Sequence, residues 1–149
     1  MKTKRYLLTA ILGLAVMASA LSPACAGRVL TNQPEPAYAS DITEHLLLAL
    51  NAGDYNAVTR DFDQAMLRAV TEQNFKIQFI EGIQNKIGFY QADSKRFFQC
   101  SIQAQYTTVV YYAAFSGEPG AVRVQISFQL VEGSPKVSGL FLDSPKLRG

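Results

Sequence analysis

The sequence predicts an α+β domain in which N-terminal helices pack on one face of an antiparallel sheet of about four strands. Between residues 41 and 87, apolar residues recur at helical spacing. After Gly88 the period changes to two, most plainly where apolar residues from Val122 to Leu130 alternate with polar ones. Because all the expected helices precede the expected strands, the helices should cover one face of the sheet.

The first 26 residues are expected to be a signal peptide. Three basic residues precede an uncharged run of 15 residues, Leu7 to Leu21. A membrane-spanning helix needs about 20 apolar residues, and Pro23 follows this run almost at once. Cleavage after Ala26 would release a chain that starts at Gly27. The protein is therefore predicted to be exported to the periplasm or the extracellular space, with a retained signal anchor as the alternative.

Cys25 allows a second kind of processing. A cysteine just after an apolar run resembles the acylation site of a bacterial lipoprotein, which would tether the chain to the envelope. The match is imperfect, because Leu21 stands four residues before the cysteine instead of three, and Pro23 occupies a position that usually holds a small or aliphatic residue. Contact with a membrane is expected only if Cys25 is acylated.

Composition excludes several classes of protein. With 149 residues, of which 48% are hydrophobic and 17% charged, the chain fits a single globular domain. Removal of the leader takes away three of the 14 basic residues and none of the 12 acidic ones, which leaves a net charge of about −1. No basic run that could neutralise phosphates remains, so nucleic acid is not an expected partner. Cys100 has no disulfide partner after processing and is predicted to be a small core residue.

The mature chain is expected to have two parts. Residues 27–40 contain Pro34 and Pro36 and show no periodicity, which indicates an extended tether. Residues 41–144 are expected to form the domain.

The helical half carries recognisable caps. Asp41 with Glu44 forms a capping-box pattern, Asp54 follows a C-terminal glycine, and Thr71 precedes the longest helical pattern. These signals predict helices over residues 41–51, 55–60, 61–69 and 72–87.

The strand half has period two and clear turns. A short strand is expected from Phe89 to Ala92 and a last strand from Val137 to Leu142. The segment from Arg96 to Phe115 has no Gly, Pro, Asn or Asp, so we expect one long strand that bends near Gln105 to Thr108. Alternation within it places Phe98 on the same apolar side as Cys100.

Three pieces of the sequence occur in a set order: Leu48 to Tyr55, Phe62 to Met66, and Val137 to Leu142. Together they resemble a bacterial secreted family of unknown function in the nuclear transport factor 2-like superfamily, over about residues 41–144. The resemblance implies a cone-shaped fold, in which a curved sheet wraps on the helices and a cavity often opens at the mouth. It implies no activity, because such families frequently have none known and a fold does not supply one.

No set of catalytic residues is found in the sequence. His45 has no second histidine and no nearby cysteine, so no metal site is expected. Each of four aspartates lies at a turn, a strand end or a helix start that accounts for it: Asp61, Asp63, Asp93 and Asp143. Motifs for nucleophilic or nucleotide chemistry do not occur, and no cofactor is expected. The chain is predicted to be non-catalytic; the alternative is an isomerase or dehydratase-type enzyme that uses Asp and Tyr in the cavity.

Tyrosines are the candidates for ligand binding. Tyr90, Tyr106 and Tyr112 are predicted to contact a ligand in or near the cavity, because tyrosine offers a large ring and a hydroxyl. Packing within the sheet is the alternative for all three.

The segment from Thr107 to Phe115 is apolar on both sides, so something should cover the outer side. We predict an interface at Val109, Tyr111 and Phe115, either in a homodimer or with a partner protein. The alternative is that the N-terminal tether covers a sheet edge. The function predicted from the sequence is that of an exported binding module, whose partner is an envelope protein, a second copy, or a small apolar ligand.

Overall fold

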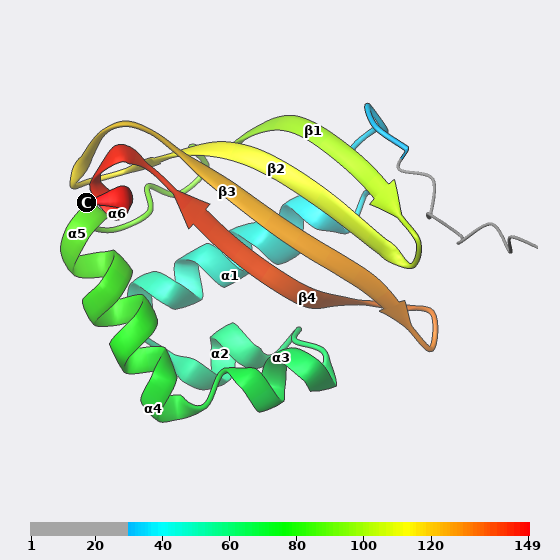
Figure 1. The fold of residues 1–149 in the computed structure, drawn as a ribbon, viewed down its shortest axis with the longest axis horizontal. Coiled ribbons are helices and arrows are strands. Elements are labelled where there is room, and N and C mark those ends of the chain that lie inside the picture. The colour runs from blue at the N-terminus through cyan, green and yellow to red at the C-terminus, as the bar shows by residue number, and fades with distance from the viewer. Residues whose placement is uncertain (1–29) are drawn as a thin grey trace, which may run out of the picture.

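The computed structural model describes residues 30–149, so the predicted leader and Cys25 lie outside the described residues. Helices precede a four-stranded antiparallel sheet with strand order β1-β2-β3-β4 (Figure 1). This confirms the α+β class. No helix in residues 30–149 is long and apolar enough to span a membrane.

The elements are α1 (Ala39–Ala52), α2 (Tyr55–Thr59), α3 (Gln64–Ala69), α4 (Glu72–Phe75), the π-helix η1 (Lys76–Gln84), α5 (Asn85–Ile87), β1 (Arg96–Gln103), β2 (Tyr106–Phe115), β3 (Glu118–Val131), β4 (Ser134–Asp143) and α6 (Pro145–Arg148).

Short polar side chains cap the starts of four helices, α2, α3, α4 and α6. Asp54 accepts from the Ala57 amide at 3.1 Å and caps α2, and Thr71 accepts from Asn74 at 3.3 Å and caps α4, as predicted. The expected capping box at Asp41 is wrong. Helix α1 begins two residues earlier, at Ala39, and its first turn has no side-chain cap. The reason is tertiary, because Glu44 turns away from its own helix end to bind the loop before β1.

The segment predicted as one helix over residues 72–87 is helical throughout, but its middle is a π-helix, η1. At Gly82, an added Cβ would lie 3.3 Å from the Ile77 carbonyl oxygen of the same helix. The glycine therefore accommodates the backbone of the widened turn rather than a neighbouring element.

Two strand predictions are wrong. Residues 96–115 form two strands, β1 and β2, joined by a tight turn at Ala104, where φ is +54°. A turn of this kind usually contains glycine or asparagine, and alanine adopts the left-handed region at a cost of about 1 kcal/mol, so the sequence carries no turn signal there. Residues 89–92 form only an isolated bridge, Tyr90 to Phe115. Helix α6 was not predicted.

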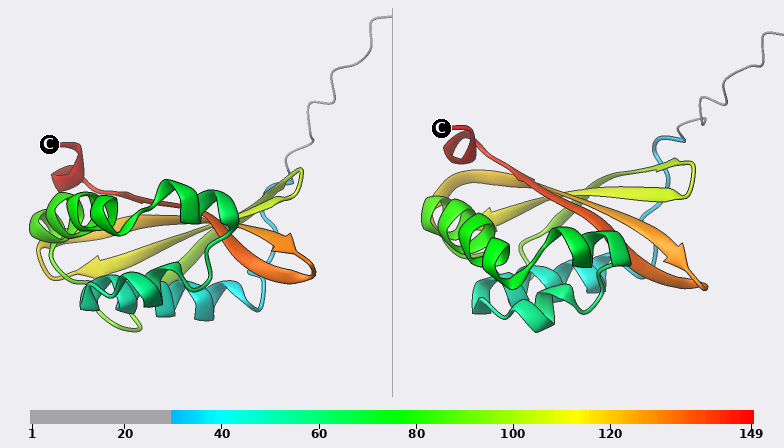
Figure 2. Two further views of the ribbon diagram at one scale, coloured as in Figure 1. Left: turned by 90° about the horizontal axis from the view of Figure 1, so that it is seen from below. Right: turned by 60° about the horizontal axis from the view of Figure 1, so that its bottom comes forward.

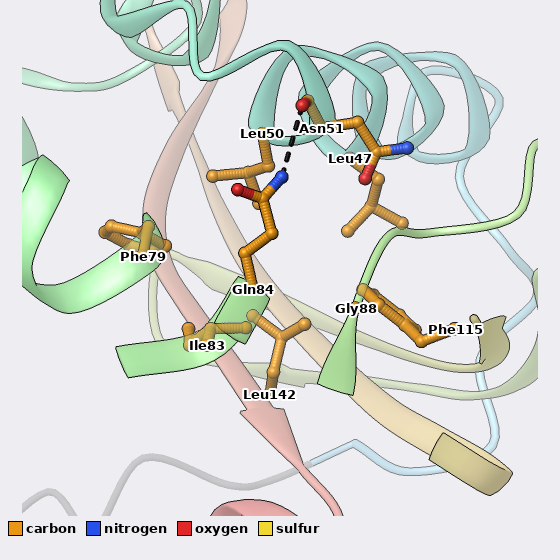
Figure 3. Close-up of a pocket in the computed structure, with 9 residues that line it drawn as sticks. All are labelled: Leu47, Leu50, Asn51, Phe79, Ile83, Gln84, Gly88, Phe115 and Leu142. Carbon is orange, nitrogen blue, oxygen red and sulfur yellow. Dashed lines mark hydrogen bonds between the residues drawn. The ribbon is translucent and has the colours of Figure 1, made fainter. Parts of the chain in front are cut away.

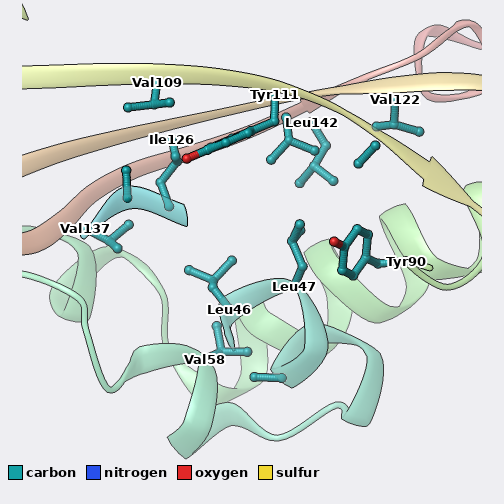
Figure 4. Packing of buried hydrophobic residues seen from close by; sticks show 14 of the residues in the cluster. Leu46, Leu47, Val58, Tyr90, Val109, Tyr111, Val122, Ile126, Val137 and Leu142 are labelled. Atoms are coloured by element: carbon teal, nitrogen blue, oxygen red, sulfur yellow. The ribbon is translucent and has the colours of Figure 1, made fainter. Parts of the chain in front are cut away.

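The core lies between the sheet and the helices that precede it in the chain, which cover one face of the sheet (Figure 2). Side chains from the strands, such as Tyr111 and Ile126, point toward Leu46 and Leu47 of α1 (Figure 4). Three register irregularities, one in each strand pair, interrupt the ladders. Because bulges bend strands and increase their twist, they account for the curvature of the sheet over the helices.

Both edges of the sheet are covered by other segments of the chain. On the β1 edge, Leu30 and Ile102 exchange backbone hydrogen bonds of 2.8 and 2.7 Å, and Gln33 donates to the Cys100 carbonyl at 3.0 Å. On the β4 edge, residues 61–63 bind the backbone of Val137 at 2.7 and 2.9 Å. The described part of the predicted tether therefore lies against the sheet, in agreement with the alternative that it covers a sheet edge. This leaves the outer face of the sheet without a covering element in residues 30–149.

Candidate functional site: the outer face of the sheet

The interior between sheet and helices is nearly filled. Its cavity has a volume of about 20 Å³, room for one water molecule. Binding sites for organic ligands usually measure about 300–1,000 Å³. Gln84 crosses the space and donates to the Asn51 carbonyl at 3.2 Å (Figure 3). The remaining lining is largely apolar: Leu47, Leu50, Phe79, Ile83, Gly88, Phe115 and Leu142. In this conformation the interior has no room for the small apolar ligand considered from the sequence.

Tyr90 lies at the end of this interior and holds two segments together. Its hydroxyl donates to Glu44 Oε2 at 2.8 Å, and Lys95 Nζ approaches the same oxygen at 2.6 Å. The Asp93 amide donates to Glu44 Oε1 at 3.0 Å. Burial alone would raise the pKa of Glu44, but these three hydrogen bonds and the Lys95 charge lower it overall. Burial, together with the carboxylate, raises the pKa of Tyr90 to about 12.

A second carboxylate–tyrosine pair joins the N-terminal segment to the sheet. The Tyr111 hydroxyl donates to Glu35 Oε1 at 2.5 Å, and only 1% of the Tyr111 surface is exposed. Burial and the neighbouring carboxylate raise the pKa of Tyr111 well above its ordinary value. Cys100 is buried close by, and burial first, then the Glu35 charge, raise the pKa of its thiol. Cys100 is thus the core residue that the sequence predicted.

The predicted interface at Val109, Tyr111 and Phe115 is wrong, because all three side chains are buried among the core residues that face the helices. Side chains alternate between the two faces of the sheet along β2, and both sets are apolar. The alternation therefore does not indicate which set faces the helices and which faces outward. The outward side carries Tyr112 and the neighbouring Val110.

The remaining titratable candidates are paired or exposed. Asp61 lies 2.9 Å from the Arg60 guanidinium and 3.8 Å from His45 Nδ1. Asp63 caps α3 and accepts from Gln129 at 2.7 Å. Asp143 lies 3.2 Å from Arg148, and Asp93 is exposed. Residues 30–149 contain no group of three or more His, Cys, Asp or Glu side chains that could hold a metal ion.

The strand register arranges the outer face in four rows, each crossing β1, β2, β3 and β4 in that order. Neighbouring members of a row lie directly opposite one another, with Cβ atoms about 5 Å apart. The first and last rows carry charges and the two middle rows carry none. The rows are Arg96–Tyr112–Arg123–Asp143, Gln99–Val110–Gln125–Phe141, Ser101–Thr108–Ser127–Gly139 and Gln103–Tyr106–Gln129–Lys136.

Aromatic side chains stand at both ends of this face. At one end, Phe98 and Tyr112 pack edge to face with ring centroids 5.2 Å apart, and 58% of Phe98 is exposed. Alternation predicted Phe98 in the core, but the irregularity between Phe97 and Gln99 turns it outward. At the other end lies Tyr106, 40% exposed. Six residues of strand, about 20 Å, separate Tyr106 from Tyr112. The structure thus brings two of the three predicted binding tyrosines to one surface.

A shallow groove of about 490 Å³ crosses the sheet beside Tyr106. It is lined by uncharged residues only: Gln103, Ala104, Tyr106, Thr108, Ser127, Ser138 and Gly139. Thr108 and Ser127 share a hydrogen bond of 2.9 Å between their hydroxyls in the floor. No sequence pattern predicts the groove, because its residues come from all four strands and only the strand register brings them together.

Comparisons of the chain with family models, with curated proteins and with solved structures give no match. The resemblance to the nuclear transport factor 2-like superfamily therefore stays a prediction.

Proposed function

We propose that this protein is an exported, non-catalytic binding module whose working surface is the outer face of its sheet. One observation carries the proposal. The interior holds about one water molecule, whereas the outer face combines exposed aromatic rings with two rows free of charge. Interface centres are depleted in charged residues and enriched in aromatic ones, with polar or charged groups at the rim. Export rests on the leader sequence.

The alternative function, that of an isomerase or dehydratase-type enzyme, has less support. Such an enzyme would need a carboxylate with space beside it for a substrate. Glu35 and Glu44 both face a tyrosine, but neither lines the interior cavity. The hydrogen bond of each glutamate with its tyrosine joins segments that are far apart in the chain, so both pairs stabilise the fold. Asp93 and Asp143 do not line it either. Asp63 lines a separate surface pocket of about 360 Å³, but its two oxygens accept hydrogen bonds from the Met66 amide and from Gln129, which is a structural use of this carboxylate.

Site-specific photocrosslinking tests the proposal in cells. A benzoylphenylalanine at Phe141 on the outer face is compared with one at Ile77 on η1, because the two side chains are 55% and 53% exposed. The full chain is expressed with its own leader and irradiated. We expect a crosslinked product of higher mass from position 141 and none from position 77. Equal crosslinking from both positions would contradict the proposal, as would no crosslinking from position 141 in a protein whose outer face also binds no small ligand.

The same experiment separates the partners predicted from the sequence. A product of twice the subunit mass indicates a homodimer that uses the outer face. A product of another mass that contains a second polypeptide indicates an envelope partner protein.

A further inference from the structure

The chemistry of the groove restricts its occupant. Its side chains offer an amide from Gln103 and hydroxyls from Thr108 and Ser127, all of which donate and accept hydrogen bonds without carrying a charge. The row beside the groove adds the amides of Gln99 and Gln125. A complementary ligand therefore has many neutral donors and acceptors. Nucleic acid and anionic headgroups do not fit, because they need cations that the lining lacks.

The position of the groove argues against an extended peptide. Peptides that bind sheets usually add a strand at an edge, where backbone groups are free. Here the groove crosses the face, and the backbone groups of neighbouring strands bind one another except at the irregularity that leaves Ser138 without a register partner. A ligand on this face therefore meets mainly side chains.

Tyr106 supplies an apolar surface at the groove wall. Its ring is 40% exposed, and its hydroxyl makes no hydrogen bond within residues 30–149. The C–H bonds on one side of a pyranose carry partial positive charge, which suits the electron-rich face of an aromatic ring. Ala104, at φ +54°, lies in the turn that brings Gln103 directly opposite Tyr106 at the end of the groove.

Gly139 keeps the floor open. Its φ lies outside the left-handed region, and an added Cβ would make only ordinary contacts, 3.7 Å to Ser127 Cβ and 3.9 Å to its hydroxyl. The backbone there accepts any small residue, so glycine is not required by the fold. Its effect is to leave the groove without a side chain where β4 meets Ser127.

We propose that this groove binds a neutral oligosaccharide, with one sugar ring stacked on Tyr106 and its hydroxyls bonded to Gln103, Thr108 and Ser127. The groove volume of about 490 Å³ is within the range of small-ligand sites. The inference rests on the proposed function and names a ligand class for the same face.

NMR titration of the whole mature chain tests the inference. The probes are cellotetraose, maltotetraose and tetra-N-acetylchitotetraose, each to millimolar concentration, followed by backbone amide shifts. We expect at least one probe to move the amides of Thr108, Ser127 and Gly139 in a saturable way. No saturable shift with any of the three, or shifts centred away from these residues, would overturn the inference.

Two matched pairs of variants locate the site. Tyr106→Ala should weaken binding about tenfold, whereas Ile77→Ala, at an exposed position on η1 away from the outer face, should leave affinity unchanged. Gly139→Ala places a methyl group in the floor and should weaken binding several-fold, whereas Gly120→Ala, with no atom within 4 Å of the new Cβ, should not. Equal effects within either pair would refute the placement. If no sugar binds but position 141 still crosslinks a polypeptide in cells, the oligosaccharide is wrong and binding through the outer face stands.

Discussion

Replacement of Tyr111 by phenylalanine should lower the free energy of unfolding by about 1.5–3 kcal/mol, the usual contribution of a hydrogen bond to an ionised acceptor. The ring packs edge-on against Phe97, with centroids 6.3 Å apart, and the substitution leaves this contact in place. The 2.5 Å bond to Glu35 is lost. Because Glu35 is half-buried, water replaces the lost donor only in part.

Urea unfolding followed by circular dichroism measures this change, since the midpoint falls while the slope with urea stays constant. For a domain of this size the loss corresponds to a melting temperature lower by about 5–12 °C. Hydrogen exchange adds a local readout. The amides of Leu30 and Gln33 bind β1 only a few residues from Glu35, so their protection should fall more than that of Ile126 in the central strand.

Tyr112→Phe is the matched control, because the Tyr112 hydroxyl makes no hydrogen bond in the described part of the chain and its ring faces out. Its free energy of unfolding should stay within about 0.5 kcal/mol of wild type. A double-mutant cycle of Tyr111→Phe with Glu35→Gln should give a coupling energy of about 1 kcal/mol or more. Equal losses for the two tyrosines, or zero coupling, would refute the reasoning.

Three further predictions follow from other parts of the chain. Gly88→Ala should cost about 3 kcal/mol or more in the urea assay, since φ is +77° and the new Cβ would lie 2.6 Å from a backbone nitrogen; Gly120→Ala should cost under about 0.5. Stability should fall as the pH drops below 4.5, because Glu44 has a lowered folded-state pKa and its contribution is lost as the pH falls through that pKa; an unchanged acid slope in Glu44→Gln would contradict this. Denaturing mass spectrometry of protein made with its own leader should give a chain that starts at Gly27, whereas a start at Cys25 with added acyl chains would establish a lipid anchor.

Interactions between residues close together in the sequence determined the helical half of this protein. Asp54 and Thr71 accept hydrogen bonds from amides three residues further on, so each cap is visible in a few letters of sequence. Gly53 ends α1 with φ +65°, a conformation that glycine adopts without strain. The change of period after Gly88 likewise separated the helices from the strands. These features depend on neighbours within about four residues, which the sequence contains.

The start of α1 shows that short-range sequence patterns do not determine every helix cap. Asp41 and Glu44 have the spacing of a capping box, yet Glu44 binds Tyr90 and Lys95 about 50 residues away. A carboxylate takes the strongest set of donors that the fold offers, and three donors outweigh one backbone amide.

Only the tertiary structure decided which side of β2 is buried and where the proposed binding face lies. Tyr111 and Tyr112 have equally apolar neighbours along the strand. Only packing of the sheet against the helices therefore determines which of the two side chains is buried. The turn at Ala104 contains no residue that favours a turn, and its position depends on the pairing of β1 with β2. The groove joins Thr108, Ser127 and other side chains that strand register alone brings together. Register is a long-range property, because it is set by packing on the helices and by partner strands rather than by the residues next to each side chain.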